Sequence, residues 1–267
     1  MKTRTLSGIV LLLLGIMMSC KQSAPPEKYK VLIWSDEFDG TELDETKWEV
    51  QLGTGGSYGL YLWGNNEQQF YRRENITVNN GVLRIRSQRE NFQNMEYTSG
   101  RMRSLNKGDF KYGRIEARIK MDNAPGLWHA FWMLPSNPDV GWPISGEIDI
   151  MEFVGNTPTQ VLNYIHFADI NNIHRFRGTF HNLLTPHTNF HIYAVEWDEN
   201  KINWFVDDVM TFSVTREDAD LVDVWPFDRQ FHLLLNTAVG GNLGGNINAQ
   251  AMTTARFMEV DYVRVYQ

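Results

Sequence analysis

The chain has 267 residues and a formal net charge of −7, with 42% hydrophobic and 21% charged residues. These values are ordinary for a globular protein and exclude a disordered chain, a collagen-like fibre and a protein with many membrane spans. The acidic balance argues against nucleic acid as a partner, because a polyanion-binding protein needs a basic face. The single Cys excludes an intrachain disulfide.

The first segment of the chain has the features of a secretion signal. Lys2 and Arg4 precede an apolar run over residues 9–18, which is too short to span a bilayer but matches a signal-peptide core. The run ends just before Cys20, a pattern similar to a bacterial lipoprotein signal in which that Cys carries the lipid. The alternative is a short buried helix with an incidental Cys.

This pattern divides the chain into three parts. We expect a signal peptide over residues 1–19, a lipidated tether over 20–29 and one folded domain over 30–267. The lipid would anchor the protein to the bacterial cell envelope, at the outer membrane or cell surface. The sequence does not fix which membrane or which face, and it suggests no oligomer, so we expect a monomer.

Alternation of apolar and polar residues, typical of strands, dominates the chain beyond residue 30. Strand-like runs occupy residues 82–86, 114–120, 201–206, 231–237 and 258–266. Clusters rich in Gly and Asn separate such runs at residues 53–59, 79–81 and 240–246. Because no helical period is sustained between them, we expect an all-β antiparallel sandwich or barrel.

The most informative segment holds three acids within six residues, namely Glu147, Asp149 and Glu152. On a regular strand Glu147 and Asp149 share one face, but strict alternation would bury Glu152. A β-bulge near residues 150–151 would return Glu152 to the acid face. Three clustered acids repel one another, so at least one should have a raised pKa, which suits a retaining glycoside hydrolase. The spacing alone leaves open an exposed acidic face, with or without a bound Ca²⁺.

Several motifs decide between these alternatives. The sequence GEIDIME at 146–152 resembles the E-x-D-x-x-E signature of glycoside hydrolase family 16. Other segments are similar to its laminarinase branch, in family order: WSDEF at 34–38, WGNNE at 63–67, YTSGR at 97–101, FKYGRIEAR at 110–118, GLW at 126–128, FWMLP at 131–135, AVGGN at 238–242 and VDYVRVY at 260–266. The resemblance covers nearly the whole chain after the tether.

The resemblance implies a concanavalin A-like antiparallel β-jelly-roll sandwich with an open concave substrate cleft. It implies a retaining endo-β-1,3-glucanase acting on laminarin-type glucan without a catalytic cofactor. Glu147 would be the nucleophile, Glu152 the general acid/base, and Asp149 the residue that maintains their protonation states. Mixed-linkage β-glucan, an algal galactan such as agar or carrageenan, or a non-catalytic sugar-binding lipoprotein remain alternatives. A purely structural adhesion lipoprotein would leave the Trp and Asn motifs unexplained.

Other residues are expected to bind sugar or to support the acids. Trp128 and Trp132 share a strand face and could stack on glucose rings, as could Trp142, although each could instead pack in the core. The resemblance places Asn65, Glu67 and Arg101 in the cleft, with a surface ion pair as the alternative for Arg101. His166 could face the acid/base from the next strand, or be structural. The remaining His residues show no metal-ligand spacing.

Two departures and one possible metal site complete the comparison with the family pattern. The family usually has Pro where this chain has His129, and often Trp where it has Leu243; both positions are expected at the cleft rim. The resemblance also suggests a structural Ca²⁺ remote from the acids, held by Glu37, the Gly81 carbonyl and Asp261, whose oxygens suit a hard cation. The alternative is no metal at this position.

Overall fold

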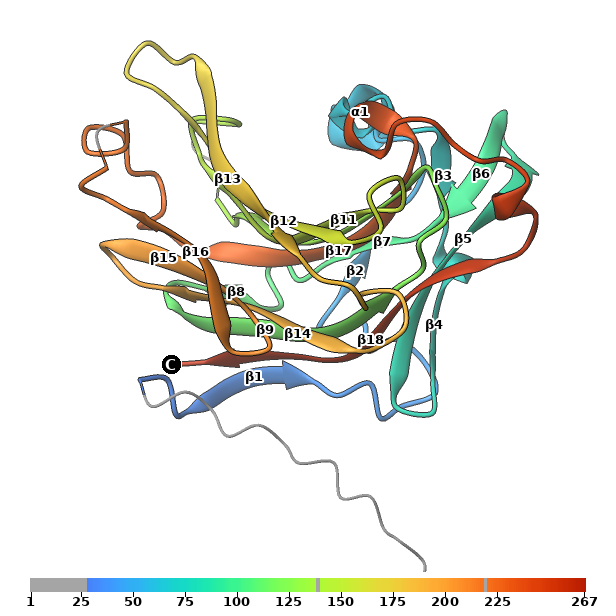
Figure 1. Cartoon of the computed structure of the whole chain (residues 1–267), viewed down its shortest axis with the longest axis horizontal. Helices are drawn as coiled ribbons and strands as arrows, with labels where there is room; N and C mark the ends of the chain where they lie inside the picture. The colour runs from blue at the N-terminus through green and yellow to red at the C-terminus, as the bar shows by residue number, and fades with distance from the viewer. Residues whose placement is uncertain (1–27, 138–139, 219) are drawn as a thin grey trace, which may run out of the picture.

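The computed structural model describes residues 28–137, 140–218 and 220–267, which form two stacked sheets (Figure 1). The predicted signal peptide and Cys20 lie outside the described residues. The sheet that carries the three acids has eight strands: β13 (His174–Asn182), β12 (Gln160–Ala168), β11 (Glu147–Val154), β10 (Leu127–Pro135), β17 (Phe231–Val239), β7 (Arg101–Arg103) and β2 (Glu49–Val50), with β8 (Asp109–Phe110) paired to β17. We call it the inner sheet.

The outer sheet has ten strands. They are β16 (Val209–Thr215), β15 (Lys201–Val206), β14 (His191–Trp197), β9 (Gly113–Met121), β18 (Arg256–Tyr266), β5 (Val82–Phe92), β6 (Met95–Ser99) and β3 (Gln69–Tyr71), with β1 (Leu32–Asp36) beside β18 and β4 (Ile76–Asn79) beside β5. All pairings within the described residues are antiparallel except that of β3 with β6. The expected jelly-roll sandwich is therefore confirmed, and the barrel alternative is not.

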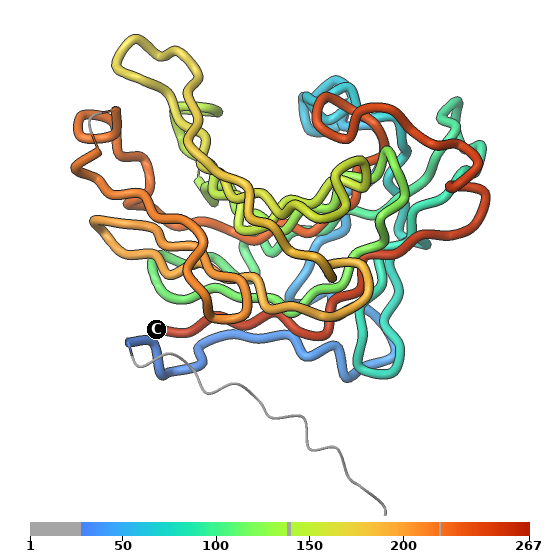
Figure 2. Tube along the Cα trace, viewed as in Figure 1, coloured from blue at the N-terminus to red at the C-terminus, as the bar shows by residue number. Residues whose placement is uncertain are grey.

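The inner sheet is curved, and its concave face opens away from the outer sheet. Figure 2 shows the chain rising on both sides of this face, at β13 on one side and near α1 (Gly241–Gly244) on the other. Four short 3-10 helices complete the regular structure of the described residues: η1 (Gly56–Tyr58), η2 (Tyr61–Gly64), η3 (Arg73–Asn75) and η4 (Ala251–Thr253). No helix among the described residues is long and apolar enough to cross a membrane.

Large apolar side chains fill the space between the sheets. Trp48, Phe131, Phe153 and Trp197 are fully buried there. Every residue of β17 is buried, as its continuous apolar run predicts. The two inward faces meet because alternation along each strand sends apolar residues to one side.

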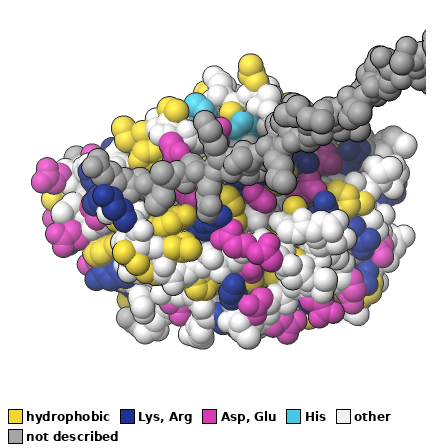
Figure 3. All heavy atoms as spheres, turned by 90° about the horizontal axis from the view of Figure 1, so that it is seen from below, with side chains coloured by type: hydrophobic (Ala, Val, Ile, Leu, Met, Phe, Trp, Pro, Cys, Tyr) yellow, Lys and Arg dark blue, Asp and Glu magenta, His cyan; other side chains and the backbone are white. Residues whose placement is uncertain are grey.

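The charged face of β9 differs from expectation. Alternation over residues 114–120 is present, yet Arg114 and Glu116 are buried with a hydrogen bond of 2.8 Å between them. Arg114 also pairs with Glu196 on β14 and with Asp208, which follows β15. The guanidinium also lies 5.5 Å from the ring of Phe205 on β15, and the buried charges are tolerated because the guanidinium and the carboxylates are paired. Elsewhere, acidic and basic side chains are interspersed over the face seen in Figure 3.

The first described residues already contact the sandwich. Lys28 Nζ lies 2.8 Å from Asp198 Oδ2, and the ring of Tyr29 is buried. The predicted tether over residues 20–29 therefore includes two residues that belong to the folded domain. They lie beside the outer sheet, on the side of the molecule opposite the concave face (Figure 1).

Candidate active site

The predicted bulge lies in the middle of β11 and is confirmed by the strand register. Asp149 pairs with Tyr164 and Glu152 pairs with Leu162, so residues 150 and 151 together oppose the single residue Asn163. The register with β10 shifts at the same place. Ile150 and Met151 both belong to the hydrophobic core between the sheets, whereas consecutive residues of a regular strand point to opposite faces. The extra residue therefore returns Glu152 to the concave face.

Two buried side chains satisfy the carbonyl groups at the bulge. The Nδ2 of Asn163 donates to the carbonyl of Ile150 at 2.8 Å, and the indole of Trp204, from the outer sheet, donates to the carbonyl of Asp149 at 2.8 Å. Thr211 in turn donates to Oδ1 of Asn163 at 2.9 Å. A bulge disrupts the regular ladder, and buried carbonyls without partners are costly, so these donors stabilise the geometry that aims Glu152.

Glu147 and Glu152 each accept an indole hydrogen bond. Trp142 Nε1 donates to Glu147 Oε2 at 2.7 Å, and Trp128 Nε1 donates to Glu152 Oε1 at 2.8 Å. Asp149 lies between them on the strand, is only 2% exposed, and shares a hydrogen bond with Glu147. The indoles orient the two glutamate carboxyls, while Asp149 is close enough to influence the charge of both.

Burial raises the pKa of all three acids, and mutual repulsion adds to the shift. The pKa of Glu147 rises to about 8, through burial first and the charge of Asp149 second. Burial, opposed by the Trp128 hydrogen bond, raises the pKa of Glu152 to about 7. Burial and the charge of Glu152 raise the pKa of Asp149 well above its ordinary value. At neutral pH the cluster therefore retains protons, as the sequence predicts.

The roles expected of Glu147 and Asp149 depend on where one of those protons lies. Oδ2 of Asp149 accepts no hydrogen bond among the described residues, and Nε2 of His166 lies 3.3 Å from it. Glu147 is half-buried and has its indole donor, which favours the ionised form. A nucleophilic Glu147 must be ionised, although burial raises its pKa to about 8, so that role requires the proton of the Glu147–Asp149 pair to lie on Asp149. Glu152 has a pKa suited to giving and taking a proton near neutrality.

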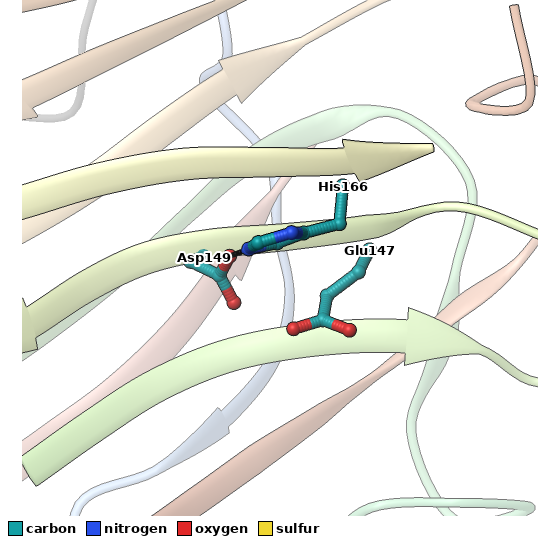
Figure 4. A group of neighbouring side chains, drawn as sticks. All are labelled: Glu147, Asp149 and His166. Atoms are coloured by element: carbon teal, nitrogen blue, oxygen red, sulfur yellow. Dashed lines mark ion pairs between the residues drawn. The ribbon is translucent and has the colours of Figure 1, made fainter. Parts of the chain in front are cut away.

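His166 lies on the next strand, but it faces a different acid from the one expected. Its backbone pairs with Glu147, and its Nε2 lies 3.3 Å from Oδ2 of Asp149 (Figure 4). The expectation that it faces Glu152 is therefore wrong. Glu152 pairs with Leu162, four residues before His166 on β12, and His166 lies beside Asp149. Its other nitrogen, Nδ1, lies 2.9 Å from Nε2 of His174 on β13. This His pair fixes the imidazole beside Asp149.

The three tryptophans predicted to bind sugar all reach the concave face. Trp128 and Trp132 share a face of β10, and both are half-buried rather than packed in the core. Trp132 donates its indole proton to Asn236 on β17 at 2.8 Å. Trp142 precedes β11 and remains 54% exposed. Their ring faces are thus available beside the acids.

Arg101 is buried at the same surface, so the alternative of a surface ion pair is wrong. Its guanidinium lies 4.6 Å from the ring of Trp63 and 4.9 Å from that of Trp132, and its Nε donates to Gln51 at 2.7 Å. Glu67 is also buried, and accepts from Tyr71 at 2.8 Å and from a Gln side chain.

Asn65 lies in the loop after η2, where its carbonyl accepts from the backbone of Asn242 at 2.8 Å. This contact ties the loop to α1. Leu243 in α1 is exposed, which agrees with the expected position at the rim. These residues lie at the side of the concave face remote from β13 (Figure 1).

His129, by contrast, does not lie at the rim. It is fully buried, with Nδ1 at 2.8 Å from Oγ1 of Thr237 and Nε2 at 2.9 Å from the carbonyl of Asp122. Its ring stacks on Phe153, and burial lowers its pKa to about 4. Alternation on β10 sends Trp128 to the concave face and therefore His129 to the core. The departure from the family pattern is a matter of packing, not of sugar contacts.

The residues suggested for calcium are engaged elsewhere. Arg264 donates to both carboxylate oxygens of Glu37, at 2.9 and 2.7 Å, and Arg118 donates to Oδ2 of Asp261 at 2.7 Å. Gly81 lies in the turn between β4 and β5. Calcium binds sets of oxygen ligands, and a guanidinium on each carboxylate competes with it. The two carboxylates, paired as they are with Arg side chains, do not fit a calcium ion. Calcium binding here stays a prediction from the resemblance.

Several residues of the site were not found in the sequence. Asn163 and Trp204 stabilise the bulge, Asn236 orients Trp132, and His174 contacts His166. None lies in a chemically suggestive spacing. Only the register of β11, β12 and β13 brings the two His residues together, and that register depends on pairing over the whole inner sheet.

Comparisons with known proteins agree with this geometry. The family described as Glycosyl hydrolases family 16 matches residues 63–264. A β-glucanase of Rhodothermus marinus is 38% identical over all of this chain and 97% of its own length. The crystal structure of the R. marinus laminarinase superposes with a TM-score of 0.79 at 40% identity, covering 88% of this chain and 96% of that one.

A second solved structure extends the likeness beyond one organism. The laminarinase catalytic domain of Thermotoga maritima has a TM-score of 0.82 at 35% identity, covering 89% of this chain and 98% of that one. The match of the family covers most of the chain, and the three acids lie on the bulged strand that its signature predicts. The chain therefore belongs to glycoside hydrolase family 16.

Proposed function

We propose that the protein is a retaining endo-β-1,3-glucanase that hydrolyses laminarin-type glucan by double displacement. The observation that carries the proposal is the bulge in β11, which gathers Glu147, Asp149 and Glu152 on one face with an indole donor on each glutamate. Relatives that cover nearly the whole chain are named β-glucanase and laminarinase.

The first step uses Glu147 and Glu152 together. The Glu147 carboxylate attacks the anomeric carbon, and Glu152 donates its proton to the glycosidic oxygen as the bond to the leaving sugar breaks. A covalent glycosyl ester on Glu147 results. Burial keeps Glu152 protonated to about pH 7, and thus supplies the acid that this step requires.

The second step reverses the role of Glu152. Its carboxylate removes a proton from water, the water oxygen attacks the anomeric carbon, and the ester to Glu147 breaks with net retention. Asp149 stays protonated beside Glu147 and contributes no second negative charge, so the departing carboxylate is accommodated. His166 holds Asp149 in place from the neighbouring strand.

A substrate panel tests the proposal. The purified protein is incubated with laminarin, lichenan, agarose and carrageenan, and new reducing ends are followed. We expect laminarin to be cleaved fastest, with a spread of oligosaccharides early in the reaction, as an endo-acting enzyme produces. Faster cleavage of lichenan or of a galactan would replace the substrate assignment, and binding without new reducing ends would favour the non-catalytic alternative.

Stereochemistry tests the mechanism separately. Proton NMR of the first products should show the β-anomer before mutarotation equilibrates it. Initial formation of the α-anomer would contradict double displacement, whichever glucan is cleaved.

The location of the protein is a further part of the proposal. We infer that Cys20 is lipidated and that the enzyme is an anchored monomer of the cell envelope, acting on polysaccharide outside the membrane. The described chain begins beside the outer sheet, so a tether there would leave the concave face free. Labelled palmitate should be incorporated into the full chain but not into a Cys20→Ala variant, and light scattering of the solubilised protein should give the monomer mass.

A further inference from the structure

The concave side of β13 exposes aromatic rings in addition to the three acids and three tryptophans described above. Phe176 is 62% exposed and Phe180 is 56% exposed. β13 is the edge strand of the inner sheet, and an exposed aromatic edge invites unwanted strand pairing. Two large rings kept at such an edge suggest a binding function.

The strand register places both rings on the face that carries the acids. Phe176 pairs with His166, which pairs with Glu147. Phe180 pairs with Leu162, which pairs with Glu152. Directly paired residues share a face, and Phe176 is two strand spacings from Glu147, roughly 10 Å.

A band of rings connects Phe176 to the acids. Ring centroids are 4.7 Å apart for Trp142 and His174, 5.1 Å for His174 and His166, and 6.1 Å for His166 and Phe176. Tyr164 lies 6.0 Å from Phe176. The aromatic surface is therefore continuous from the nucleophile to the edge strand.

A glycine gives Tyr164 its position. A Cβ atom at Gly178 would lie 2.1 Å from Cδ1 of Tyr164, so the tyrosine ring lies directly across the main chain of β13. This ring fills the interval between Phe176 and Phe180. We call His174, Phe176, Phe180 and Tyr164 the β13 platform.

Charged side chains of β13 point away from this surface. Arg175 pairs with Asp169, and Arg177 pairs with Asp218 and Asp220. The concave face of β13 thus carries only uncharged groups, since burial and the neighbouring His166 lower the pKa of His174. An uncharged aromatic surface suits the apolar faces of neutral sugar rings and offers no cation to a sulfate group.

We propose that the β13 platform binds sugar residues of a neutral β-glucan beyond those that contact the acids, and so sets the enzyme's preference for longer chains. The inference rests on the proposed function and deepens it. The ligand is a run of glucose units continuous with the chain held at Glu147 and Glu152. Phe176 and Phe180 would act in binding alone, without touching the reacting atoms.

Kinetics on substrates of two lengths test the proposal. Phe176→Ala and Phe180→Ala are compared with wild type on laminaritetraose and laminariheptaose. We expect kcat/KM for the heptaose to fall about tenfold for Phe176→Ala, corresponding to roughly 1.4 kcal/mol, with less than a twofold change for the tetraose. Phe176→Trp should restore heptaose activity, and Leu32→Ala, an exposed apolar change on β1, should alter neither substrate.

Binding to a silenced enzyme separates affinity from turnover. In a Glu147→Gln background, calorimetry should show weaker heptaose binding for the Phe176→Ala variant and unchanged tetraose binding. Equal losses on both substrates, or no loss on either, would overturn the proposal. A wild-type dimer that becomes monomeric in the Phe variants would also overturn it, by assigning the platform to a contact between copies.

The proposed function can fail independently of the platform. If wild type cleaves neither laminarin nor the heptaose, the substrate assignment fails. If wild type cleaves the heptaose well and the Phe variants do the same, only the platform proposal fails. The wild-type rate on the heptaose is therefore measured before the variants are compared.

Discussion

Two carboxylate clusters, one on each sheet, are built from the same residue types but differ in their partners. On the outer sheet Glu116, Glu196 and Asp208 all pair with the guanidinium of Arg114. On the inner sheet Glu147, Asp149 and Glu152 have indole donors and one imidazole, but no Lys or Arg pairs with them among the described residues. The outer cluster shares one cation among three carboxylates, whereas the inner cluster has no cation and must retain protons.

The difference separates acids that a cation holds ionised from acids that can exchange a proton near neutral pH. A carboxylate beside a cation is held ionised and has little tendency to exchange a proton near neutral pH. A buried carboxylate beside other carboxylates has a raised pKa and can exchange one, at a cost in stability. Acid density alone therefore does not distinguish the two clusters, whereas a paired cation does.

The largest expected effect is the loss of the nucleophile. Glu147→Gln should lower kcat at least 1000-fold, roughly 4 kcal/mol in the barrier, because an amide cannot form the glycosyl ester. Glucan binding should persist, since the change is nearly isosteric. Reducing-end assays and calorimetry measure the two quantities. Glu116→Gln in the outer cluster is the matched control and should keep its activity; a Glu147→Gln variant within tenfold of wild type would remove Glu147 from its role.

Removing Arg114, the cation of the outer cluster, should lower the stability of the protein and leave its activity unchanged. Arg114→Met leaves three acids without their shared partner, and breaking a buried ion pair in this way costs about 3–5 kcal/mol of unfolding free energy. The kcat of the folded fraction should be unchanged because the change is on the other sheet. Chemical denaturation and active-site titration check both statements. A loss below about 1 kcal/mol would show that the cluster is solvated rather than paired.

Loss of Asn163, which donates a hydrogen bond at the bulge, should lower both the stability and the activity of the protein. Asn163→Ala removes the hydrogen bond to the Ile150 carbonyl and should cost about 1–3 kcal/mol. It should also lower kcat at least fivefold with KM unchanged, because Glu152 loses its aim while the sugar contacts remain. Thr211→Val, which leaves that bond in place, is the control. If Asn163→Ala raised KM instead, its role would lie in binding.

The sequence predicted the bulge because the spacing of the three acids does not fit a regular strand. Glu147 and Asp149 demand one phase and Glu152 another, and an extra residue is the simplest resolution. Alternation on β10 likewise predicts that His129 points to the core, whereas the family resemblance placed it wrongly at the rim. Pattern along one strand was thus sufficient wherever the outcome depended on that strand alone.

Contacts across strands were beyond the sequence. The pairing of His166 with His174, the donor role of Asn163 and the burial of Arg114 depend on register and on neighbours distant in the chain. The expectation that His166 faces Glu152 was wrong for this reason. The sequence placed His166 on the correct strand, but it did not show which acid would lie opposite. Local pattern fixes which face a residue takes, and tertiary pairing fixes its neighbour.

The smallest effect concerns pH and follows from the raised pKa of Glu152. In the unfolded chain this group has its ordinary pKa of 4.5, and in the folded protein its pKa is about 7. The folded state therefore binds more protons between these values, so its stability is fully present below about pH 4.5 and declines as pH rises through 7. Glu152→Gln cannot ionise and should escape this decline.

We expect Glu152→Gln to match wild type at pH 5 and to be more stable by about 1–2 kcal/mol at pH 8, less than the full shift because neighbouring acids share protons. Glu259, which pairs with Arg84 and Lys120, is the control: its cationic partners lower its pKa, so Glu259→Gln should be destabilising at pH 8. Denaturant melts of both variants at the two pH values give the four differences. A Glu152→Gln variant less stable than wild type at pH 8 would mean that Glu152 has an unrecognised cationic partner, and that the two clusters do not differ as their surroundings indicate.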